Sequence, residues 1–328
     1  MIISGQNRRS QGLAPRSCTV PIIAICSLSC FRIASALSPQ DTAAIASSAP
    51  VEEVVVSASK LIDRKTLEHV VLPRFVKSHG TPSERIGQIG RWYAKVCPET
   101  VGLQPAYNEY ISRRVVEVAH SVGAPTQLVG KCGGNVKIIF SPHPQAQLDY
   151  IATRYKVYLG YSTRPSELSK FNHAIQAWYV TGTRSSVFLR APPKCADCVP
   201  PGANGLAVDS DSWVMGQAGS YLSNDLRSEF VQVTVIADAN ALVQYPARTV
   251  ADYIAMLVLT RTALNGCNLL PSIIDVLSPD CDARTKPQGI TEADSSYLKA
   301  LYSSNLEMKV NLEQGEMRDQ MLKSIEGR

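Results

Sequence analysis

The sequence predicts an α+β fold in which a mixed β-sheet packs on helices. Residues 230–238 form an apolar, β-branched run typical of a buried strand, and residues 250–259 form an unbroken apolar run typical of a buried helix. Further strand-like runs lie upstream of both, whereas helical patterns gather towards residue 302. Strands followed by helices are typical of an α+β domain. We therefore expect a buried central helix and a C-terminal helical part.

Residues 1–36 are predicted to be a secretory signal peptide. Three arginines precede the apolar stretch 18–31, and Ala34-Ser35-Ala36 offers the small residues that a signal peptidase recognises. The stretch is shorter than the about 20 residues that span a bilayer; a short buried helix is the alternative. A lipoprotein signal ending at Cys30 is disfavoured because Ser27 stands where leucine is usual. We expect an exported protein, periplasmic or secreted, with no membrane span after cleavage.

Charge argues against nucleic acid as a partner. Four of the 33 basic residues and none of the 28 acidic residues lie within residues 1–36, which leaves 29 basic against 28 acidic residues. A chain this close to neutrality lacks the basic patch that phosphate recognition needs. The partner is unknown from the sequence, and a protein or an envelope component is the class that an exported chain would meet.

Six cysteines remain outside the expected signal peptide, and they predict three disulfides. An even number of cysteines in an exported chain is typical of disulfide bonding, although six cysteines allow 15 connectivities. By local order we expect the pairs Cys97 with Cys132, Cys195 with Cys198, and Cys267 with Cys281.

The closely spaced pair Cys195 and Cys198 has three interpretations. A zinc half-site needs a second matching pair, which the wider spacing of Cys267 and Cys281 does not provide. A redox-active pair normally opens a helix, but prolines lie on both sides of this one. A small structural disulfide in a surface loop is favoured.

Residues 37–66 are expected to lead into the domain. Residues 37–50 are rich in alanine and serine without periodicity, which indicates a disordered linker. Residues 51–66 begin with a β-branched run that predicts an N-terminal strand or arm. The run at residues 52–58 resembles the start of the plug of TonB-dependent receptors, but the chain lacks the alternating segments of their barrel. A periplasmic partner of an outer-membrane transporter is therefore one hypothesis.

The next elements are predicted from periodicity. Residues 67–79 are expected to form short extended segments, and residues 86–93 carry apolar side chains at near-helical spacing. Apolar residues recur every three or four positions over residues 105–122, which predicts an amphipathic helix ended by Gly123.

The middle of the chain predicts strands separated by a long loop. Residues 135–140 and 174–180 have the composition of strands, and residues 144–151 of a short helix. A loop rich in proline and glycine follows over residues 191–205, and residues 212–215 are a further possible strand.

The order of the last elements resembles the catalytic half of zincins. An apolar strand is followed by the central helix, a loop containing Pro271-Ser272-Ile273, and a closing helix that begins near Gly289-Ile290-Thr291 and ends at Tyr302. This order is similar to that of matrixin-like zincins and of a group of secreted bacterial proteins of unknown function. The resemblance covers about residues 228–302. It implies one zincin-like domain over residues 67–328, whose earlier part supplies the mixed sheet and a backing helix.

The resemblance also implies a degenerate zinc site. In zincins the central helix carries two histidines one turn apart beside a carboxylate base. Here the aligned positions are Ala251, Asp252 and Ala255. Alanine offers no lone pair, and without zinc-bound water Asp252 has nothing to deprotonate. We interpret Asp252 as an acid on the helix surface.

The histidines do not replace the missing ligands. None of the five lies three or four residues from another, so no helix can present two of them to one ion: His69, His79, His120, His143 and His173. Each is expected to be exposed or hydrogen-bonded, and we expect neither a metal nor another cofactor.

Other catalytic patterns are weak. Ser185-Ser186 lacks the glycine-flanked elbow of hydrolases, and Gly133-Gly134 enters a strand instead of a helix, the wrong order for a phosphate loop. Asp225, Glu229 and Asp238 could form a carboxylate cluster, although Asp238 is more simply a strand-ending turn.

The sequence leaves three hypotheses of function. The first is an exported, disulfide-stabilised and non-catalytic zincin-like protein that serves as a binding or envelope module. The second is a hydrolase or peptidase with a non-standard site, and the third is the transporter partner described above.

Overall fold

The structure is a computed structural model, and it describes residues 62–126, 133–185, 226–264, 266–304 and 308–327. All of these residues belong to one compact unit, Val55–Arg328, which is distinct from the unit Met1–Val54. The expected signal peptide and linker lie outside the described residues, as do the predicted strand at residues 212–215, Cys132, Cys195 and Cys198.

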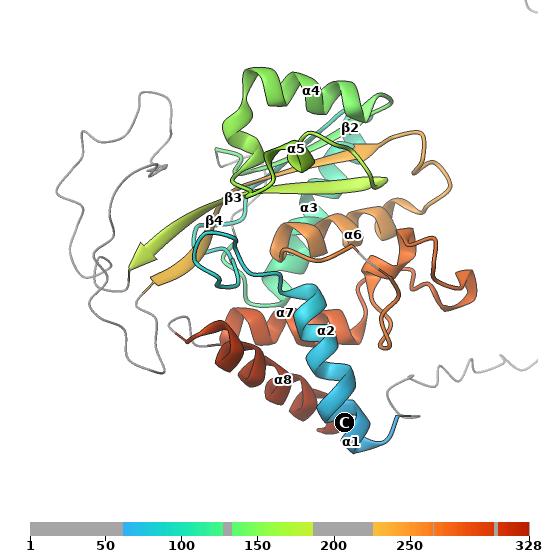
Figure 1. Cartoon of the computed structure of the whole chain (residues 1–328). Helices are drawn as coiled ribbons and strands as arrows, with labels where there is room; N and C mark the ends of the chain where they lie inside the picture. Colours follow the sequence, from blue (N-terminus) through green and yellow to red (C-terminus); the bar gives the residue numbers. More distant parts are fainter. Residues whose placement is uncertain (1–61, 127–132, 186–225, 265, 305–307, 328) are drawn as a thin grey trace, which may run out of the picture. The chain divides into compact units, whose positions relative to one another are not determined.

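A four-stranded mixed sheet lies at the centre of the described unit (Figure 1). Its strands are β1 (Pro98–Val101), β2 (Val136–Ser141), β3 (Ile175–Ser185) and β4 (Leu226–Asp238), in the order β1-β2-β4-β3. β1, β2 and β4 are parallel, and β3 runs antiparallel to β4. The strands predicted at residues 135–140, 174–180 and 230–238 are confirmed as β2, β3 and β4, and the fold class is α+β.

Alternation along the strands gives the sheet two different faces. In β2, Val136, Ile138 and Phe140 are buried in the main core, whereas Ile139 packs against a smaller cluster on the other face. Because successive side chains of a strand point to opposite faces, this pattern assigns one face to the main core. The opposite face carries the smaller cluster.

Two helices, α3 (Pro105–Ser121) and α6 (Ala247–Leu259), cover the main-core face (Figure 1). Proline at the first position of α3 costs no hydrogen bond, because the first amides of a helix have no partner within it. Gly123 follows α3 with φ of 82°, a conformation that favours glycine. The predicted helix over residues 105–122 and its glycine stop are confirmed.

The other face of the sheet carries α4 (Pro144–Arg154), the short 3₁₀ helix η3 (Lys156–Leu159) and α5 (Pro165–Leu168). Their small core contains Leu148, Ile151, Leu159, Trp178 and Ile236. The indole of Trp178 donates to the Leu168 carbonyl at 2.8 Å, which fastens α5 to β3. The predicted short helix at residues 144–151 is confirmed as α4.

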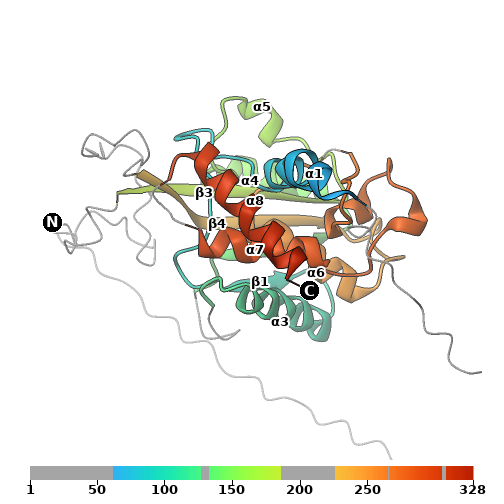
Figure 2. The ribbon, with the colours of Figure 1, turned by 90° about the horizontal axis from the view of Figure 1, so that it is seen from below.

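The chain ends in two helices, α7 (Glu292–Ser303) and α8 (Val310–Glu326), which pack against each other (Figure 2). Thr291 and Asp294 form a capping box at the start of α7. α8 also packs against α2 (Leu72–His79), and Arg91 forms a buried ion pair with Glu313 of α8. The expected C-terminal helical part is therefore present.

The expected extended segments at residues 67–79 are helical, which corrects the prediction. The chain runs through α1 (Arg64–Thr66), a π-helical turn η2 (Leu67–Val71) and then α2. Leu67, Val71, Leu72, Phe75 and Val76 are buried at a spacing that suits a helix. Pro73 obscured this pattern, yet it stands within the first positions of α2, where proline is tolerated. The end of the expected arm at residues 51–66 is likewise helical.

Two other predictions fail in detail. Residues 86–93 form turns and isolated bridges, one of them between Pro82 and Ile89, instead of a helix. The apolar residues between Tyr253 and Leu264 also predict a helix that reaches Leu264, but the central helix ends at Leu259 and Thr260 is already extended.

Candidate functional site

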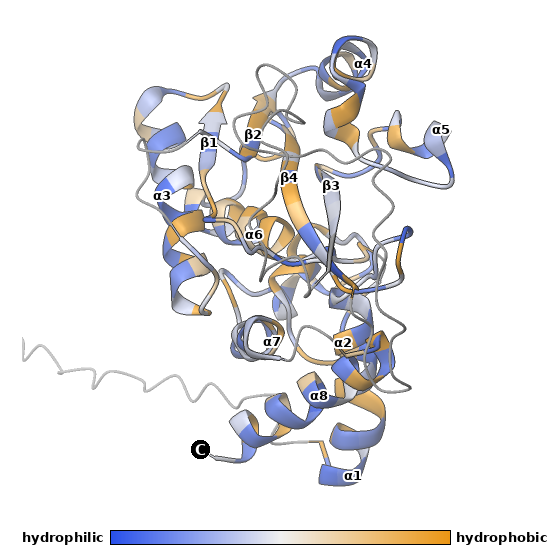
Figure 3. Cartoon of the chain, turned by 90° about the vertical axis from the view of Figure 1, so that its left-hand side faces the viewer, coloured by the Kyte–Doolittle hydropathy of each residue, from blue (hydrophilic) through white to orange (hydrophobic). Residues whose placement is uncertain are grey.

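The central helix α6 is enclosed on all sides. Every residue from Thr249 to Leu259 is buried, including Ala251 and Ala255 at the two positions aligned with zinc ligands. Figure 3 shows α6 and β4 as largely apolar elements at the middle of the fold. A helix that is apolar all round is expected to be buried in this way. The face of α6 that carries Ala251 and Ala255 is therefore filled by protein.

Asp252 is a buried acid and not a surface one, which corrects the sequence interpretation. Its side chain is 1% exposed, and Arg114 of α3 donates from Nε to its Oδ1 at 2.6 Å. The backbone amide of Ile290 donates to Oδ2 at 3.1 Å. The hydrogen bond that Arg114 donates to Asp252, together with the negative charge of that carboxylate, raises the pKa of Arg114. Asp252 therefore ties α6 to α3 and to the segment before α7.

Gly289 makes room for this arrangement. A Cβ atom at this position would lie 2.7 Å from Oδ2 of Asp252, closer than van der Waals contact allows. The glycine therefore lets the backbone before α7 approach the carboxylate.

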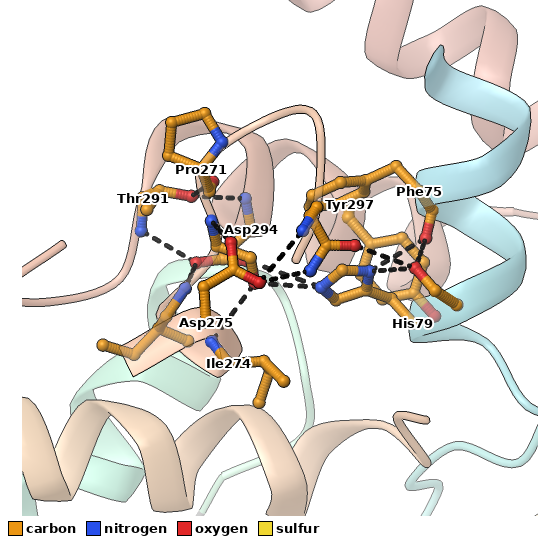
Figure 4. Close-up of polar contacts among 12 residues, drawn as sticks. Phe75, His79, Pro271, Ile274, Asp275, Thr291, Asp294 and Tyr297 are labelled. Carbon is orange, nitrogen blue, oxygen red and sulfur yellow. Dashed lines mark hydrogen bonds and ion pairs between the residues drawn. The ribbon is translucent and has the colours of Figure 1, made fainter. Parts of the chain in front are cut away.

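A second buried network surrounds His79, at the end of α2 (Figure 4). Its Nδ1 lies 2.8 Å from the Phe75 carbonyl oxygen, and its Nε2 lies 2.9 Å from Oγ of Ser272. Ser272 in turn donates to Oδ1 of Asp294 at 2.6 Å. The imidazole stacks on the Phe75 ring with centroids 3.9 Å apart. Three segments that are distant in sequence meet at this point.

The proton positions of this network follow from its partners. A carbonyl oxygen only accepts, so Nδ1 of His79 carries a proton, and Nε2 of the neutral ring is an acceptor. The single hydroxyl proton of Ser272 therefore lies between two acceptors, Nε2 and Asp294. Burial lowers the pKa of His79, and the charge of Asp294 offsets part of this shift.

This network resembles a catalytic triad in composition but not in arrangement. In a Ser-His-Asp triad the acid orients the histidine through Nδ1, whereas here a backbone carbonyl takes that position and the acid contacts the serine. All three side chains are also fully buried. The network can fasten α2 to the start of α7, but it cannot meet a substrate.

Asp294 and Asp275 shape the loop that precedes α7. Asp294 accepts from the amide of Ile273 at 2.8 Å, and Asp275 accepts from the amide of Ser272 at 3.0 Å. The second contact belongs to a capping box at the start of the 3₁₀ helix η6 (Ile273–Leu277). Burial raises the pKa of Asp275, while its hydrogen bonds from Asn268 and Ser272 act against this shift.

The cysteines of this region are oxidised. A disulfide joins Cys267 to Cys281 and closes the loop that contains η6, the pairing expected from local order. Cys97 is also disulfide-bonded, and its expected partner Cys132 lies outside the described residues.

A pocket of about 430 Å³ lies between this loop and the start of β3. Tyr253 of α6, His173 and Asp280 are among its lining residues, together with Asn172 and Ser278. Burial lowers the pKa of His173 and so favours its neutral imidazole. No motif links these residues in the sequence, because they come from three separate segments.

The other sequence candidates are not assembled into a site. Glu229 and Asp238 stand nine positions apart on β4, about 30 Å along a strand, and Asp225 lies outside the described residues. Asp238 accepts from the amide of Asn240 at 2.9 Å, which confirms the strand-ending turn. Within the described ranges, no three side chains of histidine, cysteine, aspartate or glutamate group so as to hold a metal ion.

No protein-family model, curated protein or solved structure matches this chain. None of the helices in the described part of the chain combines the length and the apolar character needed to cross a bilayer. Residues 54–57, on which the transporter-partner hypothesis depends, lie outside the described residues.

Proposed function

We propose that this protein is an exported, disulfide-stabilised, zincin-like module that acts by binding and not by metal-dependent catalysis. The observation that carries the proposal is the enclosure of α6. The positions where a zincin keeps its ligands hold Ala251 and Ala255, both without exposed surface. A metal-dependent peptidase needs an open coordination position beside its substrate, and this helix offers none.

The order and packing of the elements support the zincin-like part of the proposal. The backing helix α3 and the central helix α6 cover one face of a mixed sheet, and α7 follows the disulfide loop. Asp252 supports the non-catalytic part, because both of its carboxylate oxygens are engaged by Arg114 and the Ile290 amide. It acts as a connector between helices.

Zinc content and peptidase activity test the proposal directly. We expect purified protein dialysed against metal-free buffer to hold far less than one zinc per chain, measured by mass spectrometry of the metal. We also expect no casein cleavage that a chelator abolishes. Stoichiometric zinc that survives dialysis, together with chelator-sensitive cleavage, would overturn the proposal. Loss of that zinc in His143→Ala and His173→Ala variants would then identify ligands assembled from distant histidines.

A second candidate function is hydrolysis in the pocket beside α6. It is favoured by His173, which faces the same pocket as Asp280 and the buried Tyr253. A panel of ester and peptide substrates tests it, with His173→Ala as the diagnostic variant and the exposed His120→Ala as its matched control. Turnover lost in the first variant and kept in the second would favour hydrolysis over the binding module.

A further inference from the structure

The pocket of about 430 Å³ beside α6 collects polar side chains that have no partner within the described part of the protein. Four of them come from the start of β3 and from the disulfide loop: Asn172, His173, Ser278 and Asp280. No described residue makes a hydrogen bond or an ion pair with any of these four side chains. The hydroxyl of Tyr253 is a fifth group of this kind, although Tyr253 is only 3% exposed. Because polar groups of folded proteins are usually satisfied, such a pocket indicates a place where a ligand can supply their partners.

An apolar surface lines the same pocket. Ile274 and Tyr253 contribute buried side chains to it, and Leu264 and Leu277 contribute half-buried ones. Sites for small molecules have volumes of about 300–1,000 Å³ and combine a mainly apolar lining with a few polar groups. The volume and the lining of this pocket both match that class. A ligand therefore needs an apolar body to cover these side chains, together with at least one polar group.

The charge of the lining is negative. Asp280 carries a carboxylate, whereas burial lowers the pKa of His173 and favours its neutral form. None of the described lining residues is a lysine or an arginine. The ammonium group of Lys286 donates to the carbonyl oxygen of Ser278 at 2.8 Å, and Lys286 does not line the pocket. A cationic group of a ligand would therefore meet an opposite charge in the lining, and an anionic group would not.

The disulfide between Cys267 and Cys281 fixes the part of the pocket that carries this charge. Gly266 and Asp280 each precede one of the two cysteines, and both line the pocket. The Cα atoms of the cysteines are 5.5 Å apart, so the two lining segments are held close together. A site that is ordered before binding loses less conformational freedom when the ligand arrives. The disulfide therefore favours binding beside Asp280.

We infer that this pocket binds a primary amine carried on an apolar body. The carboxylate of Asp280 accepts from the ammonium group, and the apolar body covers Leu264, Ile274 and Leu277. The inference rests on the proposed binding function and names a ligand class for it. It is separate from the absence of zinc ligands on α6, because neither Ala251 nor Ala255 lines this pocket.

Titration of the full chain with 2-phenylethylamine, followed by nuclear magnetic resonance, tests this inference. Two probes of nearly the same shape are the ligand controls, neutral 2-phenylethanol and anionic phenylacetate. We expect saturable binding of the amine and about fivefold weaker binding of both controls, because a partly exposed ion pair contributes up to about this factor in affinity. None of the three probes contains an ester or peptide bond, so binding is measured apart from any hydrolysis in the same pocket.

Asp280→Asn is the diagnostic variant, because it removes the charge and keeps the shape of the side chain. We expect it to bind the amine about fivefold more weakly and 2-phenylethanol with unchanged affinity. Asp282→Asn is the matched control, since Asp282 pairs with Arg284 at 2.9 Å and does not line the pocket. This variant should bind the amine as the unmodified protein does. Unchanged melting temperatures in both variants should show an intact fold.

The inference is overturned if the amine shows no saturable binding, if either control probe binds as tightly, or if Asp282→Asn loses as much affinity as Asp280→Asn. None of these outcomes changes the zinc content or the peptidase result, so failure of the inference is distinguishable from failure of the proposed function. A peptide with an N-terminal phenylalanine, compared with its N-acetylated form, distinguishes two sources of the amine. If the free peptide binds more tightly than 2-phenylethylamine, the ligand is a peptide terminus; if it binds more weakly, the ligand is a small free amine.

Discussion

Arg114 reaches from α3 to a carboxylate that has almost no contact with water, since the side chain of Asp252 is only 1% exposed. Removing one partner of a buried ion pair leaves an uncompensated charge in the core and costs about 3–5 kcal/mol. We expect Arg114→Met to lower the free energy of unfolding by an amount in this range, measured by urea titration.

The neighbouring arginine is the control for this experiment. Arg113 is 55% exposed and lies near Glu109 and Glu117 on the same helix. Pairs of this kind contribute about 0.3–0.5 kcal/mol, so Arg113→Met should be nearly neutral. Equal losses in the two arginine variants would show that the contact with Asp252 contributes little. The double variant Arg114→Met with Asp252→Leu should recover much of the loss, because no buried charge remains.

Leu257 tests whether α6 is the core element described here. It is buried in the main core, and truncation of a buried leucine to alanine costs about 2–5 kcal/mol. We expect the urea midpoint of Leu257→Ala to fall by an amount that corresponds to this cost. Leu312→Ala, at a 38% exposed position of α8, is the control and should move the midpoint far less. An unchanged midpoint in Leu257→Ala would contradict the position of α6 beneath the sheet.

His79 makes the stability depend on pH. Its pKa is lowered in the folded protein, chiefly by burial, so between that value and about 6.5 the unfolded chain binds the proton more readily. Stability is therefore present above pH 6.5 and is lost as the pH falls, by up to about 1.4 kcal/mol per pH unit for one proton. We expect unfolding free energies measured between pH 8 and pH 5 to show this loss.

The comparison with variants isolates the contribution of His79. Asp275, whose pKa is raised by burial, acts in the opposite direction, because its contribution is lost as the pH rises. His173 acts in the same direction as His79. The unfolding free energy of a His79→Gln variant should therefore fall less steeply with decreasing pH than that of a His173→Gln variant. If both variants keep the full slope of the unmodified protein, His79 is not the responsible group.

A chain that begins after the expected signal peptide should, when oxidised, contain three disulfides and no free thiol. Thiol counting under denaturing, non-reducing conditions checks this, and two or more reactive thiols per chain would contradict it. The Cys267–Cys281 bond spans 14 positions, and a loop of this length restricts the unfolded chain by about 3 kcal/mol. We expect the double variant Cys267→Ser with Cys281→Ser to lose a comparable amount of stability.

The sequence predicted the elements whose periodicity is clean. β2, β4, α3 and the core of α6 follow from runs of apolar residues, and Gly123 marks the end of α3 through its positive φ. α2 was missed because Pro73 and several β-branched residues outweighed the helical spacing of Leu72, Phe75 and Val76. β1 is only four residues long and alternates in burial too briefly to be recognised.

The candidate sites were harder to predict than the fold. The alanines at positions 251 and 255 indicated an absent metal site, but nothing local showed that Asp252 would meet Arg114, which lies 138 positions earlier. A groove on the sheet is lined by Glu99, Lys137 and Thr234, one from each of three neighbouring strands. It depends on the register of these strands, which the sequence of any one strand does not contain. Such sites become visible only when tertiary contacts are known.

The packing of α8 against α2 has a consequence for how the protein acquires its structure. Arg64 of α1 lies 2.9 Å from Glu326 of α8, so the first and last described helices close on each other. A chain that emerges from a ribosome or a translocation channel presents α2 long before residues 310–326. Until those residues are free, the side of α2 that packs against α8 has no cover. The contact between α2 and α8 can therefore form only after the last part of the chain has appeared.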